Sequence, residues 1–367
     1  MRATITRKDL EGHASQASIS DVQHLSSYSW IDLPEPTIAV PGMPPKWQPP
    51  KKKRRGPLPK DSGLQYLAEN EARHPDSPME PLFRAVYSAD PSFDVRNIDV
   101  VTDAKNIRKL LSFVDPASAR LGLQPFTIHA ELEGESTVTL SSVEARTSTF
   151  IMPTQFEGYG LEYKKAYTAR EIANSTGHYR VIKYSFGGLN YVVRFEADAY
   201  VDPPGSEPQA DSKSEDPIAD IINNVDHQSL GSGSKLSVRK QGRIIPLDSI
   251  LKIKPRVGHS PLKLFDLAPP LWISQTRKLV CAYHYQGEFE ETYVEDVVKK
   301  ITTYERMQQP SFERLAALMT KLTEQVKSFG GSCAIKCYSR DADELVVQRI
   351  DGKPMLPLDL YSKWDTA

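Results

Sequence analysis

The chain has 367 residues, of which 39% are hydrophobic and 25% charged, the proportions of an ordinary globular protein. Its net charge of −1 excludes a global basic field that would attract nucleic acid, although a local one can exist. Three cysteines argue against a disulfide framework, and no stretch approaches the roughly 20 apolar residues of a membrane span. We therefore expect a globular protein without a membrane partner.

The first 60 residues are rich in serine and proline, and they are predicted to form a disordered tail followed by an extended arm. Residues 1–25 are polar, whereas residues 28–50 carry large apolar side chains between prolines. Such an arm can pack on a domain or contact a protein partner. Five basic residues follow, and they indicate a nuclear localisation signal, a phosphate-binding patch or a solvated charge run. They are Lys51, Lys52, Lys53, Arg54 and Arg55.

Residues 61–360 are predicted to form a single α/β domain. Helices are expected over 64–72, 78–87 and 105–114, where apolar residues recur at helical spacing. Between 126 and 152 the period changes to two, which predicts a pair of strands.

The second half of the domain begins with a polar segment, residues 203–235, which is predicted to be a flexible insert between two strands. The apolar face of residues 311–329 predicts a long helix, which Gly330 and Gly331 would end. Two strands, 333–338 and 344–350, are expected after it.

Residues 191–201 (YVVRFEADAYV) are predicted to form a strand in which Arg194, Glu196 and Asp198 share one face. Two carboxylates on one face repel each other unless a cation lies between them or one is protonated. A divalent metal ion is the usual solution, because Mg²⁺ prefers carboxylate oxygens. The alternative is an edge strand whose acids pair with Arg194, Lys183 or solvent.

Three further motifs surround this strand in the sequence. Residues 158–162 (GYGLE) place Glu162 after a glycine-rich entry, and residues 249–256 (SILKIKPR) place Lys252 and Lys254 on one strand face. Residues 271–285 are predicted to form a helix with Gln275 near its start. Several basic residues could together line a phosphate-binding face if their strands are adjacent, and they are Arg180, Lys183, Arg194, Lys254 and Arg256.

The order of these motifs resembles that of the DXO-type decapping nucleases of the PD-(D/E)xK superfamily. The resemblance implies an α/β (α+β) fold with a mixed central sheet flanked by helices. It also implies hydrolysis of a phosphodiester or RNA 5′-end pyrophosphate bond with Mg²⁺ or Mn²⁺. By this resemblance Glu162 and Asp198 would hold the metal, with Glu196 as a weaker partner. Lys254 would position the attacking water, and Gln275 would orient the water or the phosphate.

One position departs from the family pattern. The family has glutamate in its Glu–apolar–Lys motif, where this chain has Lys252. An ammonium group cannot ligate a metal ion, so Lys252 is predicted to occupy the metal position and to pair with Glu196 and Asp198. Two hypotheses remain open: a metal-dependent nuclease weakened or inactivated by Lys252, and a non-catalytic module that binds RNA or a protein.

Longer runs, such as RVIKYSFGGLNYVVRFEADAY and LWISQTRKLVCAYH, resemble a family of fungal proteins often labelled geranylgeranyl pyrophosphate synthetase. Trans-prenyl synthases need Asp-rich clusters of the DDxxD type to hold Mg²⁺ and a diphosphate. This chain contains no Asp-Asp pair, so its residues do not support prenyl transfer.

Overall fold

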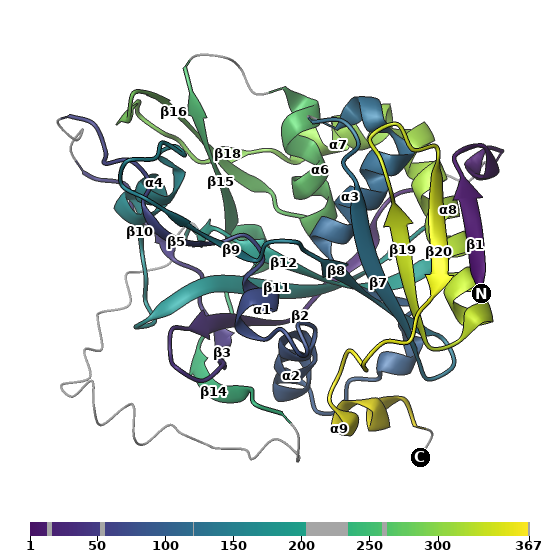
Figure 1. Ribbon diagram of the computed structural model, residues 1–367. Helices are drawn as coiled ribbons and strands as arrows, with labels where there is room; N and C mark the ends of the chain where they lie inside the picture. Colours follow the sequence, from purple (N-terminus) through teal and green to yellow (C-terminus); the bar gives the residue numbers. More distant parts are fainter. Residues whose placement is uncertain (13–16, 52–55, 120, 203–233, 259–262, 366–367) are drawn as a thin grey trace.

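The computed structural model describes residues 1–12, 17–51, 56–119, 121–202, 234–258 and 263–365 (Figure 1). An eleven-stranded sheet runs through the molecule, with parallel pairs at β6–β8, β6–β12 and β3–β14 and antiparallel pairs elsewhere. In spatial order its strands are β1 (Arg2–Thr6), β20 (Glu344–Arg349), β19 (Ser332–Cys337), β7 (Phe126–Glu133), β8 (Thr137–Val143), β6 (Val100–Asp103), β12 (Leu189–Ala197), β11 (Ser175–Phe186), β2 (Ser20–Ile31), β3 (Thr37–Gly42) and β14 (Ser237–Gly242).

Two smaller sheets complete the strand content of the described residues. The second sheet contains β10 (Thr168–Ala169), β4 (Lys46–Trp47), β13 (Ala199–Tyr200), β15 (Ile250–Val257), β16 (Lys278–Tyr285) and β17 (Glu288–Phe289), with β18 (Glu295–Asp296) paired to β16. The third is a two-stranded ribbon of β5 (Gly63–Tyr66) and β9 (Ser148–Ile151).

Helices pack on both faces of the large sheet. The α-helices are α1 (Glu69–Arg73), α2 (Glu80–Ala89), α3 (Ala104–Val114), α4 (Gly160–Tyr167), α6 (Leu264–Ser274), α7 (Val298–Met307), α8 (Gln309–Phe329) and α9 (Leu358–Tyr361). Short 3₁₀ turns are η1 (Lys8–Leu10), η2 (Val95–Asn97), η3 (Pro116–Ser118), η4 (Leu247–Ser249) and η5 (Ser362–Trp364).

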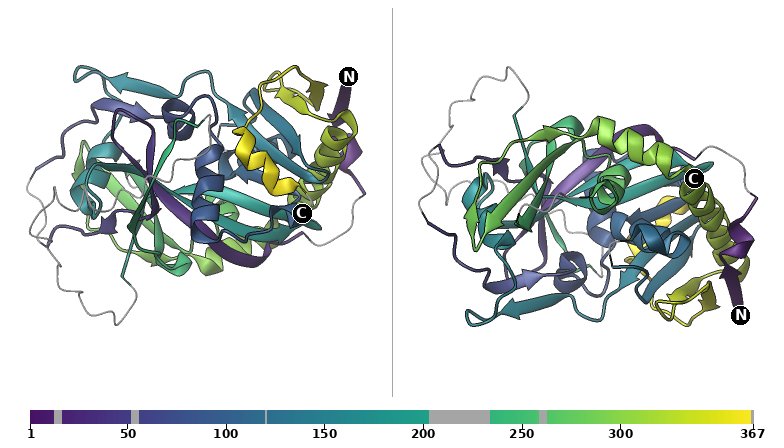
Figure 2. Two further views of the ribbon diagram at one scale, coloured as in Figure 1. Left: turned by 90° about the horizontal axis from the view of Figure 1, so that it is seen from below. Right: turned by 90° about the horizontal axis from the view of Figure 1, so that it is seen from above.

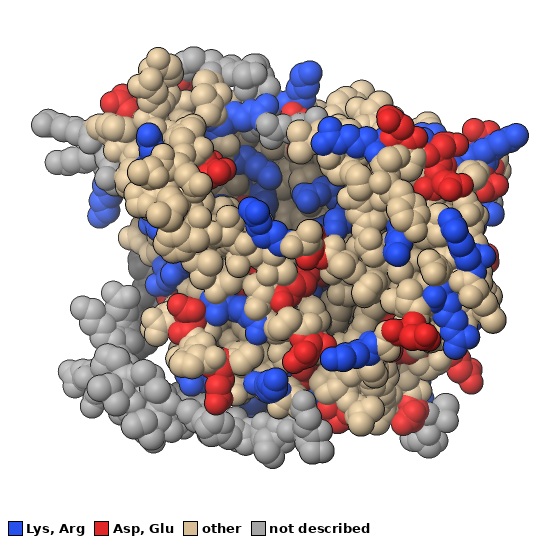
Figure 3. Space-filling view, in the orientation of Figure 1, with Lys and Arg blue, Asp and Glu red and all other residues tan. Residues whose placement is uncertain are grey.

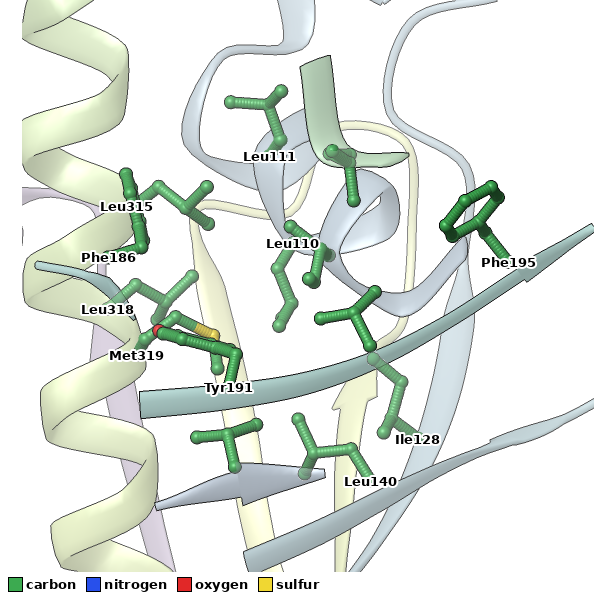
Figure 4. Close-up of a cluster of buried hydrophobic side chains, with 14 of the residues drawn as sticks. Leu110, Leu111, Ile128, Leu140, Phe186, Tyr191, Phe195, Leu315, Leu318 and Met319 are labelled. Atoms are coloured by element: carbon green, nitrogen blue, oxygen red, sulfur yellow. The ribbon is translucent and has the colours of Figure 1, made fainter. Parts of the chain in front are cut away.

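The main hydrophobic core lies between the large sheet and helices α3 and α8 (Figure 4). Leu110 of α3 and Leu318 of α8 pack there with Tyr191 of β12. A second core lies where α2 packs, and Val192 of β12 belongs to it. Successive residues of a strand point to opposite faces, so β12 contributes Tyr191 to the first core and Val192 to the second. Burial on both faces holds in place the strand that ends at the site.

The chain crosses from the large sheet to the second sheet at Asp198. This residue stands between β12, which ends at Ala197, and β13, which begins at Ala199. In the second sheet Ala199 pairs with Leu251 of β15. The crossing therefore brings the acidic end of β12 beside the lysines of β15.

The structure confirms the predicted fold class, a mixed sheet flanked by helices. The helices expected over 78–87, 105–114 and 311–329 appear as α2, α3 and α8. The strand pair expected between 126 and 152 is β7–β8, and the two strands expected after the long helix are β19 and β20.

The N-terminal residues differ from the predicted tail and arm. Strand β1 pairs with β20 at one edge of the large sheet, and the twelve-residue β2 pairs with both β11 and β3. Three of the four serines of β2, Ser26, Ser27 and Ser29, are buried, and the Ser26 hydroxyl donates to the Ala85 carbonyl. Composition could not reveal these partners, because they come from distant parts of the chain.

Two predicted helices are corrected by the structure. The helix expected over 271–285 ends at Ser274, because Gln275 adopts a left-handed conformation (φ 53°), and the following residues form β16 parallel to β15. The helix expected over 64–72 is mostly replaced by β5, followed by the short α1. In both cases pairing with a distant strand overrides the local helical spacing.

Two predicted features lie wholly or mostly outside the described residues. They are the basic run, of which only Lys51 is described, and the insert at 203–235, of which only its last two residues are described. Among the described residues, no helix is both long enough and apolar enough to cross a membrane.

Candidate functional site

A cleft with a volume of about 880 Å³ opens where the ends of β12 and β15 meet helices α1, α3 and α4 and strand β5. Figure 3 shows a hollow on this face of the molecule, with Lys and Arg side chains within it and at its rim. Glu196, Asp198, Lys252 and Lys254 all line the cleft, so the motifs on β12 and β15 do meet in space.

Asp198 lies at the centre of an ionic cluster. Its side chain is fully buried, and its Oδ1 accepts from Lys164 Nζ at 2.7 Å. Its Oδ2 accepts from Lys252 Nζ at 3.0 Å and from the Ile253 backbone N–H at 2.9 Å. Burial alone would raise the pKa of Asp198, but the two ammonium groups and the N–H hold it below its ordinary value. Asp198 is therefore an ionised carboxylate with two cationic partners.

Lys164 reaches Asp198 because it lies on the face of helix α4 that lines the cleft. Leu161, Lys164, Lys165 and Thr168 line the cleft, and these positions follow the i, i+3, i+4, i+7 spacing of one helix face. The first turn of α4 is capped by buried Asp61, whose Oδ1 accepts from the N–H groups of Leu161 (2.9 Å) and Glu162 (3.0 Å). The cap fixes the start of the helix and hence the direction of Lys164.

Further positive charge lies beside the cluster. Lys254 and Arg108 line the cleft, and within the described residues neither forms an ion pair. Burial, reinforced by repulsion from Lys252, lowers the pKa of Lys254 to about 8. The attraction of Asp198 opposes this shift without cancelling it. Lys254 is thus a cation that a bound anion would stabilise.

Acidic side chains also line the cleft. Glu196 is exposed in the cleft, and Glu69 of α1 is buried at its side. Burial raises the pKa of Glu69, although Thr176 Oγ1 (2.5 Å) and Arg73 Nε (2.8 Å) both donate to its carboxylate. The cleft therefore contains carboxylates that can accept hydrogen bonds as well as cations that can donate them.

Arg194, predicted to bind substrate, is buried in a structural ion pair. Its Nε and Nη2 donate to the two carboxylate oxygens of Asp103 at 2.6 Å and 2.9 Å, and Nη1 donates to the Pro78 carbonyl. Burial would raise the pKa of Asp103, but this guanidinium holds it below its ordinary value. The pair joins β12 to the start of α3.

Arg194 nevertheless lines the cleft, whereas four other predicted site residues do not. Glu162 accepts from Lys165 Nζ at 2.6 Å on the surface of α4, and Gln275 Nε2 donates to the Trp272 carbonyl at 2.6 Å. Arg180 is fully buried, where its Nη2 contacts His24 Nδ1 at 3.1 Å. Arg256 lies 3.9 Å from Asp266. The structure thus brings together Glu196, Asp198, Lys252 and Lys254, but not Glu162 and Gln275.

The donor set around Asp198 does not fit a divalent metal ion. Each carboxylate oxygen already accepts from an ammonium group, and lysine offers no lone pair to a metal while it is protonated. Nowhere in the described parts of the chain do three or more His, Cys, Asp or Glu side chains gather as a metal site would require. The predicted pairing of Lys252 is found with Asp198, but within the described residues Lys252 forms no ion pair with Glu196.

Solved structures share this fold over nearly their whole length. Rai1 of S. pombe has a TM-score of 0.58 at 12% identity, covering 95% of this chain and 100% of that one. Scheffersomyces stipitis Rai1, in complex with (3′-NADP)⁺ and calcium ion, has a TM-score of 0.63 at 10% identity, with 99% and 98% covered. Candida albicans Rai1, in complex with pU5-Mn²⁺, has a TM-score of 0.55 at 10% identity, with 99% of each chain covered.

These similarities define a Rai1/DXO-like fold, as the sequence motifs predicted. At these identities they show the fold and not the activity. The chain belongs to the family described as a domain of unknown function, DUF8563, whose model matches residues 4–355. No curated protein matches the sequence.

Sequence reasoning did not identify Lys164, Arg108 or Glu69 as cleft residues. Lys164 carried a usable signal, since it lies three residues after Leu161 on the face of α4 that meets the cleft. Arg108 and Glu69 carried none, because they come from helices outside the recognised motifs.

Proposed function

We propose that the cleft binds the phosphorylated 5′ end of an RNA strand without hydrolysing it through a bound metal. The observation that carries this proposal is the pairing of Asp198 with both Lys164 and Lys252. By the motif resemblance Asp198 and position 252 would hold a metal, and in this chain two ammonium groups contact Asp198 instead. A phosphate group is a ligand that several ammonium and guanidinium groups favour together.

Surplus positive charge in the cleft supports an anionic ligand. Asp198 carries one negative charge against the two ammonium groups that it contacts. Lys254 and Arg108 add two further charges that have no ion-pair partner within the described residues. Phosphate contacts supply much of the affinity of proteins for nucleic acids, so this charge can anchor a strand end.

The similar solved structures support a nucleotide ligand. One holds pU5 with Mn²⁺, and another holds (3′-NADP)⁺ with a calcium ion. Those ligands belong to those proteins. A shared fold together with a cationic cleft supports a phosphorylated nucleotide here as well.

A metal-dependent nuclease or pyrophosphohydrolase is the second candidate, because Glu196, Asp198 and Lys254 all line the cleft. This activity would require Lys164 and Lys252 to leave Asp198. It would also require Glu162 and Gln275 to leave their present partners, Lys165 and the Trp272 carbonyl. The contacts therefore favour binding over hydrolysis.

The test is fluorescence anisotropy with two single-stranded RNAs of one sequence, one 5′-phosphorylated and one with a 5′-hydroxyl, in buffer containing EDTA. We expect the phosphorylated strand to bind more tightly. Arg108→Ala should weaken its binding by about tenfold, the loss of one or two charge-assisted hydrogen bonds. Lys299→Ala, which removes an exposed lysine of α7 that does not line the cleft, is the matched control.

Equal binding of both strands, or equal weakening by Arg108→Ala and Lys299→Ala, would contradict the proposal. Release of labelled product when Mn²⁺ replaces EDTA would favour the second candidate instead.

A further inference from the structure

The β5–β9 ribbon presents apolar side chains to solvent. Leu64 and Phe150 are direct partners in this antiparallel pair, so their side chains share one face of the ribbon. They are 55% and 62% exposed, and Leu67 and Met152, just beyond the strand ends, are also at least half exposed. We call these four residues the apolar ledge.

The ribbon is a separate sheet. Within the described residues it gains no third strand, and its two arms stay joined just beyond the strand ends, where the N–H groups of Leu67 and Ala68 donate to the Thr147 carbonyl. Figure 1 shows β5 and β9 in front of β12, and in the views of Figure 2 the pair lies at the edge of the molecule. Large apolar side chains gathered on such an edge mark a binding surface.

The apolar ledge is continuous with the cationic cleft. Leu64 and Leu67 line that cleft together with Lys105, Arg108 and Lys164. A strand whose terminal phosphate lies among these cations would leave the cleft across β5. Positive charge beside an apolar or aromatic platform is the arrangement by which proteins hold single-stranded nucleic acids.

We propose that the apolar ledge stacks an unpaired base of the bound RNA, with Phe150 as the aromatic platform. This inference rests on the proposed function and adds that the ligand is single-stranded. A duplex would not fit the role, because its bases already stack on one another. Stacking on one ring face is sequence-tolerant, since every base has such a face.

The experiment measures anisotropy with the 5′-phosphorylated single-stranded RNA and uses uridine 5′-monophosphate as a competitor. Phe150→Ala should weaken RNA binding by about tenfold. It should leave the affinity for the monophosphate and the salt dependence unchanged, because no cation is removed. Phe150→Trp should retain RNA binding. Tyr338→Ala is the matched control, since Tyr338 is an exposed aromatic residue that does not line the cleft.

Wild-type binding of RNA and monophosphate with no loss in Phe150→Ala would overturn the inference and leave the proposed function standing. Failure of the wild type to bind either ligand would remove the proposed function, and the inference with it. Concentration-dependent self-association that Phe150→Ala abolishes, with RNA binding intact, would assign the apolar ledge to a second copy of the chain and overturn its role in RNA binding.

Discussion

Two buried carboxylates, Asp103 and Asp198, stand in the wall of the cleft and are neutralised in different ways. Asp103 faces a single guanidinium, that of Arg194, which donates one hydrogen bond to each of its carboxylate oxygens. Asp198 faces two ammonium groups from separate elements, Lys164 of α4 and Lys252 of β15.

The difference separates a structural pair from a ligand site. The Asp103–Arg194 pair is balanced in charge, and the Arg194 side chain is completely buried. The Asp198 cluster carries one surplus positive charge, and its lysine side chains remain 34% and 23% exposed. A buried ion pair of zero net charge joins two secondary-structure elements. A surplus of positive charge that is open to a cleft can instead attract an anion.

The largest effect is expected when the balanced pair is broken. Arg194→Met should lower the free energy of unfolding by about 3–5 kcal/mol, because it leaves the buried Asp103 carboxylate without its counter-ion. Urea denaturation measures this loss. Combining Arg194→Met with Asp103→Asn should recover part of it, since the double variant leaves no unpaired buried charge at this position.

The matched change in the open cluster, Asp198→Asn, should reduce stability by less, about 1–2 kcal/mol. Its two lysines are partly exposed and can turn toward water when the carboxylate is lost. A loss at Asp198 equal to that at Arg194 would show that both clusters are structural.

A smaller effect is expected from pH on RNA binding. Burial and its neighbours Lys252, Arg108 and Lys164 lower the pKa of Lys254 to about 8, against the attraction of Asp198. Lys254 is charged below a pH of about 8 and neutral above it, so the affinity for RNA should fall as the pH rises through about 8. The fall is at most about tenfold per pH unit, the limit for one proton.

Lys254→Arg supplies the control for this pH dependence, since an arginine at this position keeps its charge at all these pH values. We expect a flat anisotropy profile for this variant. An identical decline in Lys254→Arg and wild type would assign the pH dependence to another group.

Part of the site can be predicted from the sequence, because the alternation of side chains along a strand depends only on neighbouring residues. Alternation predicted that Glu196 shares a strand face with Asp198, and Lys252 with Lys254. The structure shows that both pairs line one cleft and that Lys252 pairs with Asp198. A strand period suffices to predict the shared faces, whereas the meeting of the two strands depends on the long-range pairing of β13 with β15.

What sequence missed depends on contacts between distant segments. Serine-rich β2 is a central strand because β3 and β11 pair with it on both sides. The direction of Lys164 depends on the start of α4, which Asp61 fixes from about a hundred residues upstream. Glu162 matched a family motif, yet its side chain pairs with Lys165 one turn further along α4 and does not line the cleft.

The central claim, that ammonium groups stand where the resembled nucleases hold a metal, is tested most directly by calorimetric titration of Mn²⁺ into wild type, Lys252→Glu and Asp198→Asn. We predict no stoichiometric binding to wild type, and binding to Lys252→Glu, because that change puts a second carboxylate beside Asp198. Stoichiometric Mn²⁺ binding by wild type that Asp198→Asn abolishes would contradict the account.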